Sequence, residues 1–268
     1  MATHRPAPAG VDTSTPNVAR MYDYYLGGKN NFAADREAAE RILTMVPELR
    51  DTALLNREFL GRAVELLAGN GIRQFIDIGS GLPTQGNVHE IAQDANPEAR
   101  VVYVDNDPVV CAHGRALLER SEGVAVVQAD LRQPEEILGS SEVRSLIDFD
   151  QPVAVLMVAI LHFVPDDDDP AGLVAKFRDA MAPGSYLVVT HATADSLAGR
   201  EEEAETGMAV YRSSNAAAIP RSRDQVVSLF DGFDLIEPGV VWIAEWGATD
   251  PVDDPEKYFV YAGVGRKP

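Results

Sequence analysis

The spacing of apolar residues changes near residue 70 and divides the chain into two parts. Before this point apolar residues recur three and four positions apart, which is the spacing of a helix with one apolar face. The pattern predicts three helices, at about residues 16–25, 33–46 and 52–68. Residues 1–15 are rich in Pro, Ala, Ser and Thr without any period, so we predict that they form a disordered lead-in.

After residue 70, short apolar runs rich in β-branched residues alternate with stretches of helix length. The predicted strands are residues 74–78, 101–104, 124–128, 153–158 and 186–190. Alternation of this kind is typical of βαβ units that form a parallel sheet. Two further predicted strands, 240–246 and 258–264, are joined by an acidic, proline-containing loop without a helix, which favours an antiparallel addition at the sheet edge.

We therefore predict an α/β chain with three parts: a lead-in at residues 1–15, a helical cap at 16–70 and a sheet domain at 71–268. In the sheet domain Asp107 and Asp169 each precede a proline, a combination that favours the start of a helix. Ser222 is a further candidate N-cap, for a helix that reaches about residue 230. Residues 195–218 have the polar composition of a helical insertion.

Polar residues and glycines gather where the first three predicted strands end. Asp77, Gly79 and Gly81 close the first strand, and glycines at such a turn let the backbone approach a ligand closely. Asp105 ends the second strand, where a carboxylate can accept hydrogen bonds from ribose hydroxyls. Asp130 ends the third strand and is a candidate partner for an adenine amino group. Three carboxylates at successive strand ends suit a ligand with a cationic head, a ribose and an adenine.

Two nucleotide-like ligands fit this arrangement to different degrees. A dinucleotide such as NAD is typically bound through G-x-G-x-x-G, whereas this chain has Thr84, preceded by Pro83, in place of the last glycine. Asp77 places a negative charge before the glycines, which is unfavourable beside a pyrophosphate and favourable beside an ammonium group. The residues therefore favour S-adenosylmethionine, with NAD second. The alternative is that these aspartates and glycines only end strands and cap helices.

The segment from Asn17 to Asp35 resembles the characteristic motif of the actinobacterial S-adenosyl methyltransferase family, long catalogued as a domain of unknown function. Further segments extend the resemblance over about residues 15–268; they begin at Asn56, Asp77, Tyr103, Ala129, Leu161 and Pro183. The resemblance implies the class I methyltransferase fold, a Rossmann-like doubly wound sheet of seven strands whose last strand is antiparallel. It implies no particular acceptor. It also implies that S-adenosylmethionine is bound by Asp77, Gly79, Ser80, Gly81, Asp105, Asn106, Asp130 and Leu131.

Five residues are candidates for contact with a methyl acceptor. His162 follows the fourth predicted strand, at the sheet edge where open α/β folds bind ligands, so it is a candidate general base or a donor that orients the acceptor. His191 has a similar place after the fifth strand. Tyr24, Tyr25 and Lys29 belong to a segment expected to cover the cleft, with a tyrosine against cofactor or acceptor and Lys29 near a carboxylate. The alternative for each is a structural role within its own loop or helix contact.

Composition and charge narrow the range of partners. Lys and Arg number 23 against 42 Asp and Glu, a net charge of −19, and no basic cluster is present, so nucleic acid is not an expected partner. The single cysteine excludes an internal disulfide, and no residues have the spacing of a metal site. No apolar run approaches the ~20 residues of a membrane span, and the start of the chain lacks the apolar region of a secretory signal. We therefore expect a cytoplasmic protein.

The sequence thus predicts an enzyme that transfers a methyl group from S-adenosylmethionine to O, N or S of an unidentified small molecule by in-line displacement. A non-catalytic sensor that binds adenosyl ligands would carry the same motifs. An NAD-linked oxidoreductase is the third hypothesis. The acceptor and the oligomeric state stay open.

Overall fold

The computed structural model describes residues 12–83, 86–118, 121–196 and 201–268, without the side chains of 201–204. Most of the predicted lead-in lies outside the described residues. So does Thr84, the residue that stands in place of the last glycine of a dinucleotide-binding motif. Within the described ranges, no helix combines the length and the apolar composition that crossing a membrane requires.

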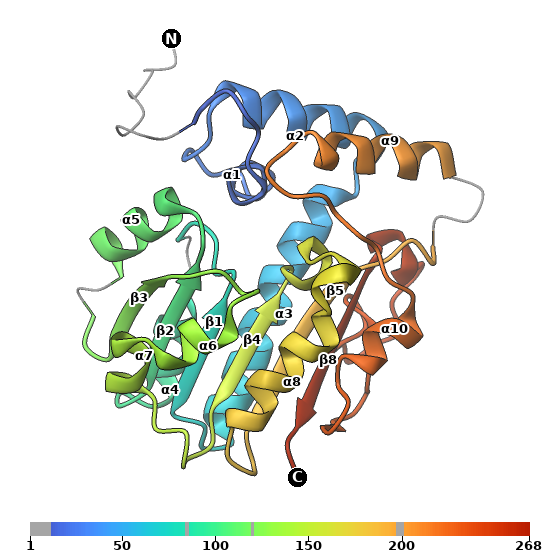
Figure 1. Cartoon of the computed structure of the whole chain (residues 1–268). Helices are drawn as coiled ribbons and strands as arrows, with labels where there is room; N and C mark the ends of the chain where they lie inside the picture. The colour runs from blue at the N-terminus through green and yellow to red at the C-terminus, as the bar shows by residue number, and fades with distance from the viewer. Residues whose placement is uncertain (1–11, 84–85, 119–120, 197–200) are drawn as a thin grey trace.

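A mixed sheet forms the centre of the molecule (Figure 1). The strand order is β3-β2-β1-β4-β5-β8-β6, and β7 also pairs with β8. The first five strands are parallel, and β8 runs antiparallel to β5, which confirms the predicted α/β fold with a late antiparallel strand. The strands are β1 Gln74–Ile78, β2 Arg100–Asp105, β3 Val124–Gln128, β4 Ala154–Val158, β5 Tyr186–Ala192, β6 Asp234–Leu235, β7 Val241–Trp242 and β8 Val260–Arg266.

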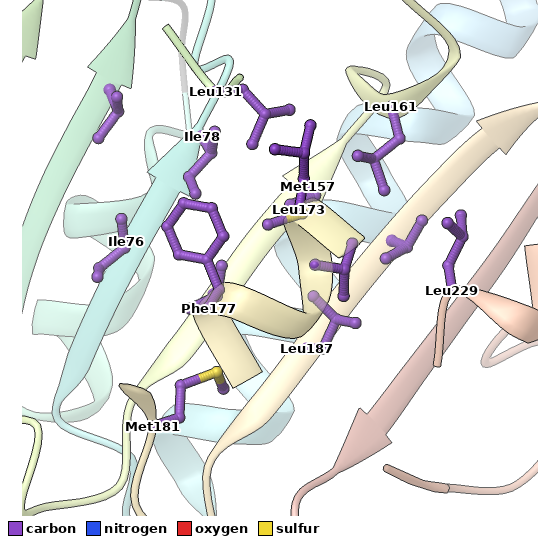
Figure 2. Packing of buried hydrophobic residues seen from close by; sticks show 14 of the residues in the cluster. Ile76, Ile78, Leu131, Met157, Leu161, Leu173, Phe177, Met181, Leu187 and Leu229 are labelled. Carbon is purple, nitrogen blue, oxygen red and sulfur yellow. The ribbon is translucent and has the colours of Figure 1, made fainter. Parts of the chain in front are cut away.

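Helices cover both faces of the sheet, and the alternation of side chains along each strand supplies two cores. Phe75 of β1 and Leu156 of β4 point to the face covered by α3, α4 and α5, whereas Ile76 and Met157 point to the face covered by α6, α7, α8 and α10. Figure 2 shows part of this second core, in which Phe177 of α8 packs beside Ile76. These helices are α3 Leu49–Gly69, α4 Val88–Ala95, α5 Pro108–Leu117, α6 Pro134–Gly139, α7 Ser141–Leu146, α8 Pro170–Ala180 and α10 Arg223–Ser228.

Three further helices lie beyond the carboxyl ends of the parallel strands (Figure 1). They are α1 Val18–Tyr25, α2 Ala33–Met45 and α9 Glu201–Arg212. A separate apolar cluster holds them together: its buried residues include Met21, Ala39 and Ile42, and Tyr211 of α9 packs against it. Segments from opposite ends of the sequence thus form one cover over the edge of the sheet where open α/β folds bind ligands.

The predicted elements agree with the observed ones except near the end of the chain. The predicted helix starts at Asp107, Asp169 and Ser222 are all confirmed, because each side chain accepts a hydrogen bond from the backbone of its helix. The predicted strand at 240–246 extends only over β7, and the two-residue strand β6 was not predicted. Both residues of β6 are exposed, so they carry no apolar pattern that sequence reasoning can detect.

The predicted boundary at residue 70 falls at the end of α3, whose two halves have different surroundings. Phe59 and Leu67 in the second half belong to the core of the sheet, whereas Ala53 in the first half packs with α1 and α2. This helix therefore connects the sheet to the helices that cover it. The division into cap and sheet domain stays a prediction.

Candidate active site

A cavity extends from the carboxyl ends of the strands into the space below α1, α2 and α9. Its lining includes several residues singled out in the sequence: Tyr25, Asp77, Gly79, Ser80, Gly81, Asp105, Asn106 and His162. Five other candidates are not among the described lining residues: Tyr24, Lys29, Asp130, Leu131 and His191. The structure thus brings the ends of β1 and β2 together with one tyrosine of α1 and one histidine.

The turn after β1 depends on two glycines. Gly79 has φ 71°, and a Cβ there would lie 2.5 Å from Cγ1 of Ile160, so both the conformation and the close approach require glycine. Gly81 has φ 66° and open space on its Cβ side, and its backbone N–H donates to Oδ2 of Asp105 at 2.9 Å. The turn therefore joins the ends of β1 and β2 and leaves room for a ligand.

Asp77 is a buried carboxyl with no hydrogen bond to any described residue. It is 5% exposed and lines the cavity, and burial raises its pKa to about 7, while the charge of Arg57 opposes that rise. Arg57 of α3 lines the same part of the cavity, and its guanidinium donates to the backbone oxygen of Gly86 at 2.9 Å. A buried carboxyl without a partner costs free energy, which a cationic ligand group would recover.

Asp105 lies beside Asp77 and is held by backbone donors. Its Oδ1 accepts from the N–H of Asp107 at 2.9 Å, and its Oδ2 accepts from Gly81. Burial raises the pKa of Asp105 to about 6, although these backbone hydrogen bonds oppose the shift. Each carboxylate oxygen has a second lone pair, so Asp105 can still accept hydrogen bonds from a ligand's hydroxyl groups.

The third carboxylate has a different environment. Asp130 pairs with Arg132, whose NH2 lies 2.6 Å from Oδ2, and this hydrogen bond holds the pKa of Asp130 below its usual value. Leu131 is buried in the core beside α6 and α8. Asn106, in contrast, lines the cavity next to Asp105. The roles predicted for Asp130 and Leu131 in adenine binding stay predictions.

A chain of hydrogen bonds forms one wall of the cavity. The N–H of Ala159 donates to Oγ1 of Thr190 at 2.8 Å, and this hydroxyl donates to Oδ1 of Asn56 at 2.7 Å. Nδ2 of Asn56 then donates to the hydroxyl of Tyr22 at 2.9 Å, which donates to the backbone oxygen of Ala53 at 3.1 Å. The wall is therefore polar but uncharged, and each of its four side-chain or backbone donor groups makes one hydrogen bond within the wall.

This wall contains residues that sequence reasoning did not select. Tyr22 and Asn56 lie inside the motifs that carry the family resemblance, so their positions were visible but their roles were not. Ala159 has φ 56°, an unusual conformation for a residue with a Cβ, and no feature of the sequence marks it. Thr190 stands near the end of β5, a position that sheet topology alone identifies as close to a ligand.

Both ring nitrogens of His191 are hydrogen-bonded within the protein. It is fully buried, and its Nε2 lies 2.9 Å from NH1 of Arg221. Because a guanidinium only donates, Nε2 accepts, and Nδ1 carries the proton that is donated to the oxygen of Ala192 at 2.7 Å. Burial lowers the pKa of His191 to about 4, so it is neutral at physiological pH.

His162 lines the cavity and is also neutral. Burial, with the neighbouring His191 and Arg221, holds its pKa well below the usual value. Its Nδ1 accepts from the N–H of Ala192 at 3.4 Å, which leaves the proton on Nε2. This tautomer makes His162 a hydrogen-bond donor toward a ligand, and it favours an orienting role over that of a general base.

The tyrosines of α1 point in different directions. The Tyr25 hydroxyl lies 3.4 Å from that of Tyr211, and both residues line the cavity. Tyr24 instead hydrogen-bonds Glu40 of α2, at the surface. Lys29 is exposed, and the described residues include no carboxylate in an ion pair with it. The position of Tyr25 in the cavity lining supports its contact with a ligand. Tyr24 and Lys29 are not among the described lining residues, so their positions give no support for such a contact.

Polar contacts fix α1 to the end of β2. Asn17 accepts from the N–H of Arg20 as the N-cap of α1, and its Nδ2 donates to Oδ2 of Asp107 at 2.5 Å. Arg20 and Asp35 form a buried ion pair with Nε 2.9 Å from Oδ2. The characteristic motif at residues 17–35 therefore builds the cover of the cavity and joins it to the residues that follow Asp105.

The described residues were also compared with the requirements of a metal site. Among the residues that the structure describes, no group of three or more His, Cys, Asp or Glu side chains is placed to hold a metal ion.

Comparisons with known proteins identify the family of the chain. Residues 4–268 match a family model described as S-adenosyl methyltransferase. A protein from Thermobifida fusca named as a candidate methyltransferase is 44% identical, with a TM-score of 0.90 over 97% of this chain and 98% of that chain. A DUF574 family protein from Streptomyces avermitilis is 39% identical, with a TM-score of 0.90 over 96% of this chain and 99% of that chain.

More distant comparisons bear on the fold alone. An O-methyltransferase family protein from Burkholderia thailandensis is 13% identical, with a TM-score of 0.51 over 84% of this chain and 61% of that chain. Comparison with curated protein sequences gives no significant match. The family model spans nearly the whole chain and agrees with the two similar structures. The chain therefore belongs to the S-adenosyl methyltransferase family and is an S-adenosylmethionine-dependent methyltransferase.

Proposed function

We propose that the protein transfers the methyl group of S-adenosylmethionine to a heteroatom of a small molecule held in the same cavity. The observation that carries this proposal is the continuity of the cavity from Asp77 and Asp105 to the space enclosed by α1, α2 and α9. A cofactor at the strand ends would then have its reactive group directed at a second, enclosed compartment.

The residues at the sheet end fit the cofactor. Asp77, which is buried without a hydrogen bond to any described residue, suits the ammonium group, and Arg57 suits the carboxylate of the same amino-acid end. Asp105 suits the ribose hydroxyls, and Gly81 has open space where another residue would carry a Cβ, so a ligand can approach its backbone closely. Asp130 stays a predicted partner of the adenine amino group. When bound, S-adenosylmethionine supplies an electrophilic methyl group on a sulfonium.

The protein's own contribution is positioning. Holding the acceptor in line with the methyl group can supply several kcal/mol, on the order of 7–11 in favourable cases. His162 would donate from Nε2 to the acceptor and so orient it, and the helical cover would exclude water. The acceptor's lone pair forms the new bond to carbon, the sulfur keeps the electrons of the broken bond, and any proton on the acceptor passes to solvent.

Calorimetry with S-adenosylmethionine, S-adenosylhomocysteine and NAD tests the proposal. We expect both adenosyl ligands to bind and NAD not to bind. Failure of both adenosyl ligands would overturn the proposal, and binding of NAD alone would support an oxidoreductase. Turnover is then measured as release of S-adenosylhomocysteine with an acceptor library; binding without any such release would favour the sensor hypothesis.

A further inference from the structure

The cavity has its charged residues at one end only. Arg57, Asp77, Asp105 and Asp107 are the charged residues among its described lining, and all lie at the strand ends or on the part of α3 beside them. The other end is lined by uncharged residues from α1, α2, α3, α9 and neighbouring loops, among them Tyr25, Ile42, Leu49, Phe163, Met208 and Tyr211. Although the chain has a net charge of −19, the described side chains that line this compartment carry no charge.

Two tyrosine hydroxyl groups supply polar atoms to this compartment, and the hydrogen bond between them is weak. The hydroxyls of Tyr25 and Tyr211 face each other at 3.4 Å, too long for a strong hydrogen bond, so one polar group of a ligand can lie beside them and bond to either. The pKa values of both tyrosines are raised because burial disfavours the charged form. The same burial penalises any ionised ligand group placed there, since no described side chain offers an opposite charge.

Aromatic side chains come from three separate elements around the compartment. Tyr25 lies on α1, Tyr211 on α9 and Phe163 on the short 3-10 turn Leu161–Phe163. The rings of Phe163 and Tyr211 are 6.0 Å apart at 53°, and the ring of His162 lies 4.4 Å from that of Phe163. Aromatic walls of this kind favour a ring-bearing ligand through offset or edge-to-face contacts.

We propose that the methyl acceptor is a neutral, ring-bearing small molecule whose apolar body lies among Tyr25, Phe163 and Tyr211. Its nucleophilic hydroxyl, amine or thiol would lie toward His162 and the cofactor. Molecules with a carboxylate or phosphate on the ring system are excluded by the uncharged walls. This inference rests on the proposed function and specifies its acceptor.

Matched probes test the charge requirement. Three series of probes are built on phenol, naphthol and indole cores. Each series contains a neutral methyl ester, the corresponding carboxylate and the corresponding amine in its protonated form. Binding of each probe is measured to protein saturated with S-adenosylhomocysteine. We expect the neutral member to bind at least tenfold more tightly than either ion in at least one series. Equal or tighter binding of the carboxylate or the amine overturns the proposal, and so does failure of all nine probes. If S-adenosylhomocysteine itself does not bind, the proposed function fails before this comparison is reached.

Two adjacent substitutions on α9 provide a matched control. Met208 lines the cavity, whereas Ala209 is exposed and does not, so Met208→Glu and Ala209→Glu add the same charge inside and outside the compartment. Met208→Glu should weaken the neutral probe at least tenfold and favour its amine analogue, while Ala209→Glu should change neither by more than about twofold. Unchanged S-adenosylhomocysteine binding in both variants shows that the fold is intact. Equal effects of the two substitutions would contradict the location of the acceptor.

Discussion

The Asp77 carboxyl has a pKa of about 7 in the ligand-free protein because burial disfavours its charged form. In the unfolded chain the same group has a pKa of about 3.9. Between these values the folded state holds a proton that the unfolded state has lost, so stability falls as the pH rises from about 4 to about 7 and stays lower above. Asp77 thus destabilises the empty protein at neutral pH, and an ammonium group of a ligand offsets that cost.

Asp77→Asn should therefore stabilise the empty protein and weaken its binding. At pH 8 we expect the free energy of unfolding to rise by roughly 2–4 kcal/mol. This gain disappears near pH 4, because the folded wild-type protein then carries a protonated Asp77 that is as uncharged as the asparagine of the variant. S-adenosylhomocysteine should bind at least tenfold more weakly at pH 8. Denaturant titration at both pH values and calorimetry measure these effects; a variant that is no more stable at pH 8 would contradict the assigned burial cost.

Arg57 is the residue that we expect to hold the carboxylate of the cofactor's amino-acid end. Arg57→Ala should weaken S-adenosylhomocysteine about tenfold or more, because a charge-assisted hydrogen bond is lost. Binding of 5′-methylthioadenosine, which lacks the amino-acid end, should change by less than about twofold. Arg62→Ala is the control, since Arg62 lies on the same helix but pairs with Glu58 outside the cavity. Equal weakening of both ligands would contradict this assignment.

At the scale of elements, helices and strands with a strong apolar period were predictable to within a few residues. β1 and β3 have the predicted bounds, and α1 and α2 end within a residue or so of theirs. The exposed two-residue strand β6 was not predictable, since pairing with β8 defines it and no pattern of its own does. Local periodicity reports burial on one face, whereas pairing of short edge strands depends on neighbours distant in sequence.

The candidate site was predictable only where topology alone fixes position. Asp77 and Asp105 lie where parallel strands end, so their meeting at one edge follows from the fold. Tyr211 could not be paired with Tyr25 from the sequence, because the two hydroxyls meet only after α9 packs on α2. The tautomer of His162 likewise depends on the N–H of Ala192, a contact between separate strands and loops.

The turn after α1 requires a residue without a side chain at position 28, because the carboxylate of Asp23 lies against Gly28. A Cβ on Gly28 would collide with the carboxylate of Asp23, which accepts hydrogen bonds from the N–H of Asn30 and from Nδ2 of Asn31. Gly28→Ala should therefore displace Asp23 and lower the free energy of unfolding by about 2 kcal/mol. Gly139→Ala is the control, because open space surrounds that position. Chemical denaturation compares the two; equal stabilities would show that the turn adapts without loss.

At the scale of the whole molecule, the two ends of the helical cover depend on each other. The N–H of Val18 donates to Oδ1 of Asn215 at 2.8 Å, and the N–H of Asn215 donates to the oxygen of Pro16 at 3.0 Å. Residues 16–18 thereby join the segment that follows α9, while Asn17 joins the sheet through Asp107. The space proposed for the acceptor is lined by residues of α1, α2 and α9, so its shape depends on how these helices pack together.

Asn17→Ala tests this dependence, because it removes the N-cap of α1 and its hydrogen bond to Asp107 in one step. Loss of a cap and of a buried hydrogen bond costs about 1–3 kcal/mol, while Asp107 keeps the hydrogen bonds that its Oδ1 accepts from the backbone of α5. We expect hydrogen exchange to accelerate in both α1 and α9, although α9 does not contain the substitution, while the strands keep their protection. Asn70→Ala, exposed at the end of α3, should change neither helix. Acceleration confined to α1 would mean that the two ends of the cover open independently, and acceleration in β1 to β5 would mean that the cover stabilises the whole sheet.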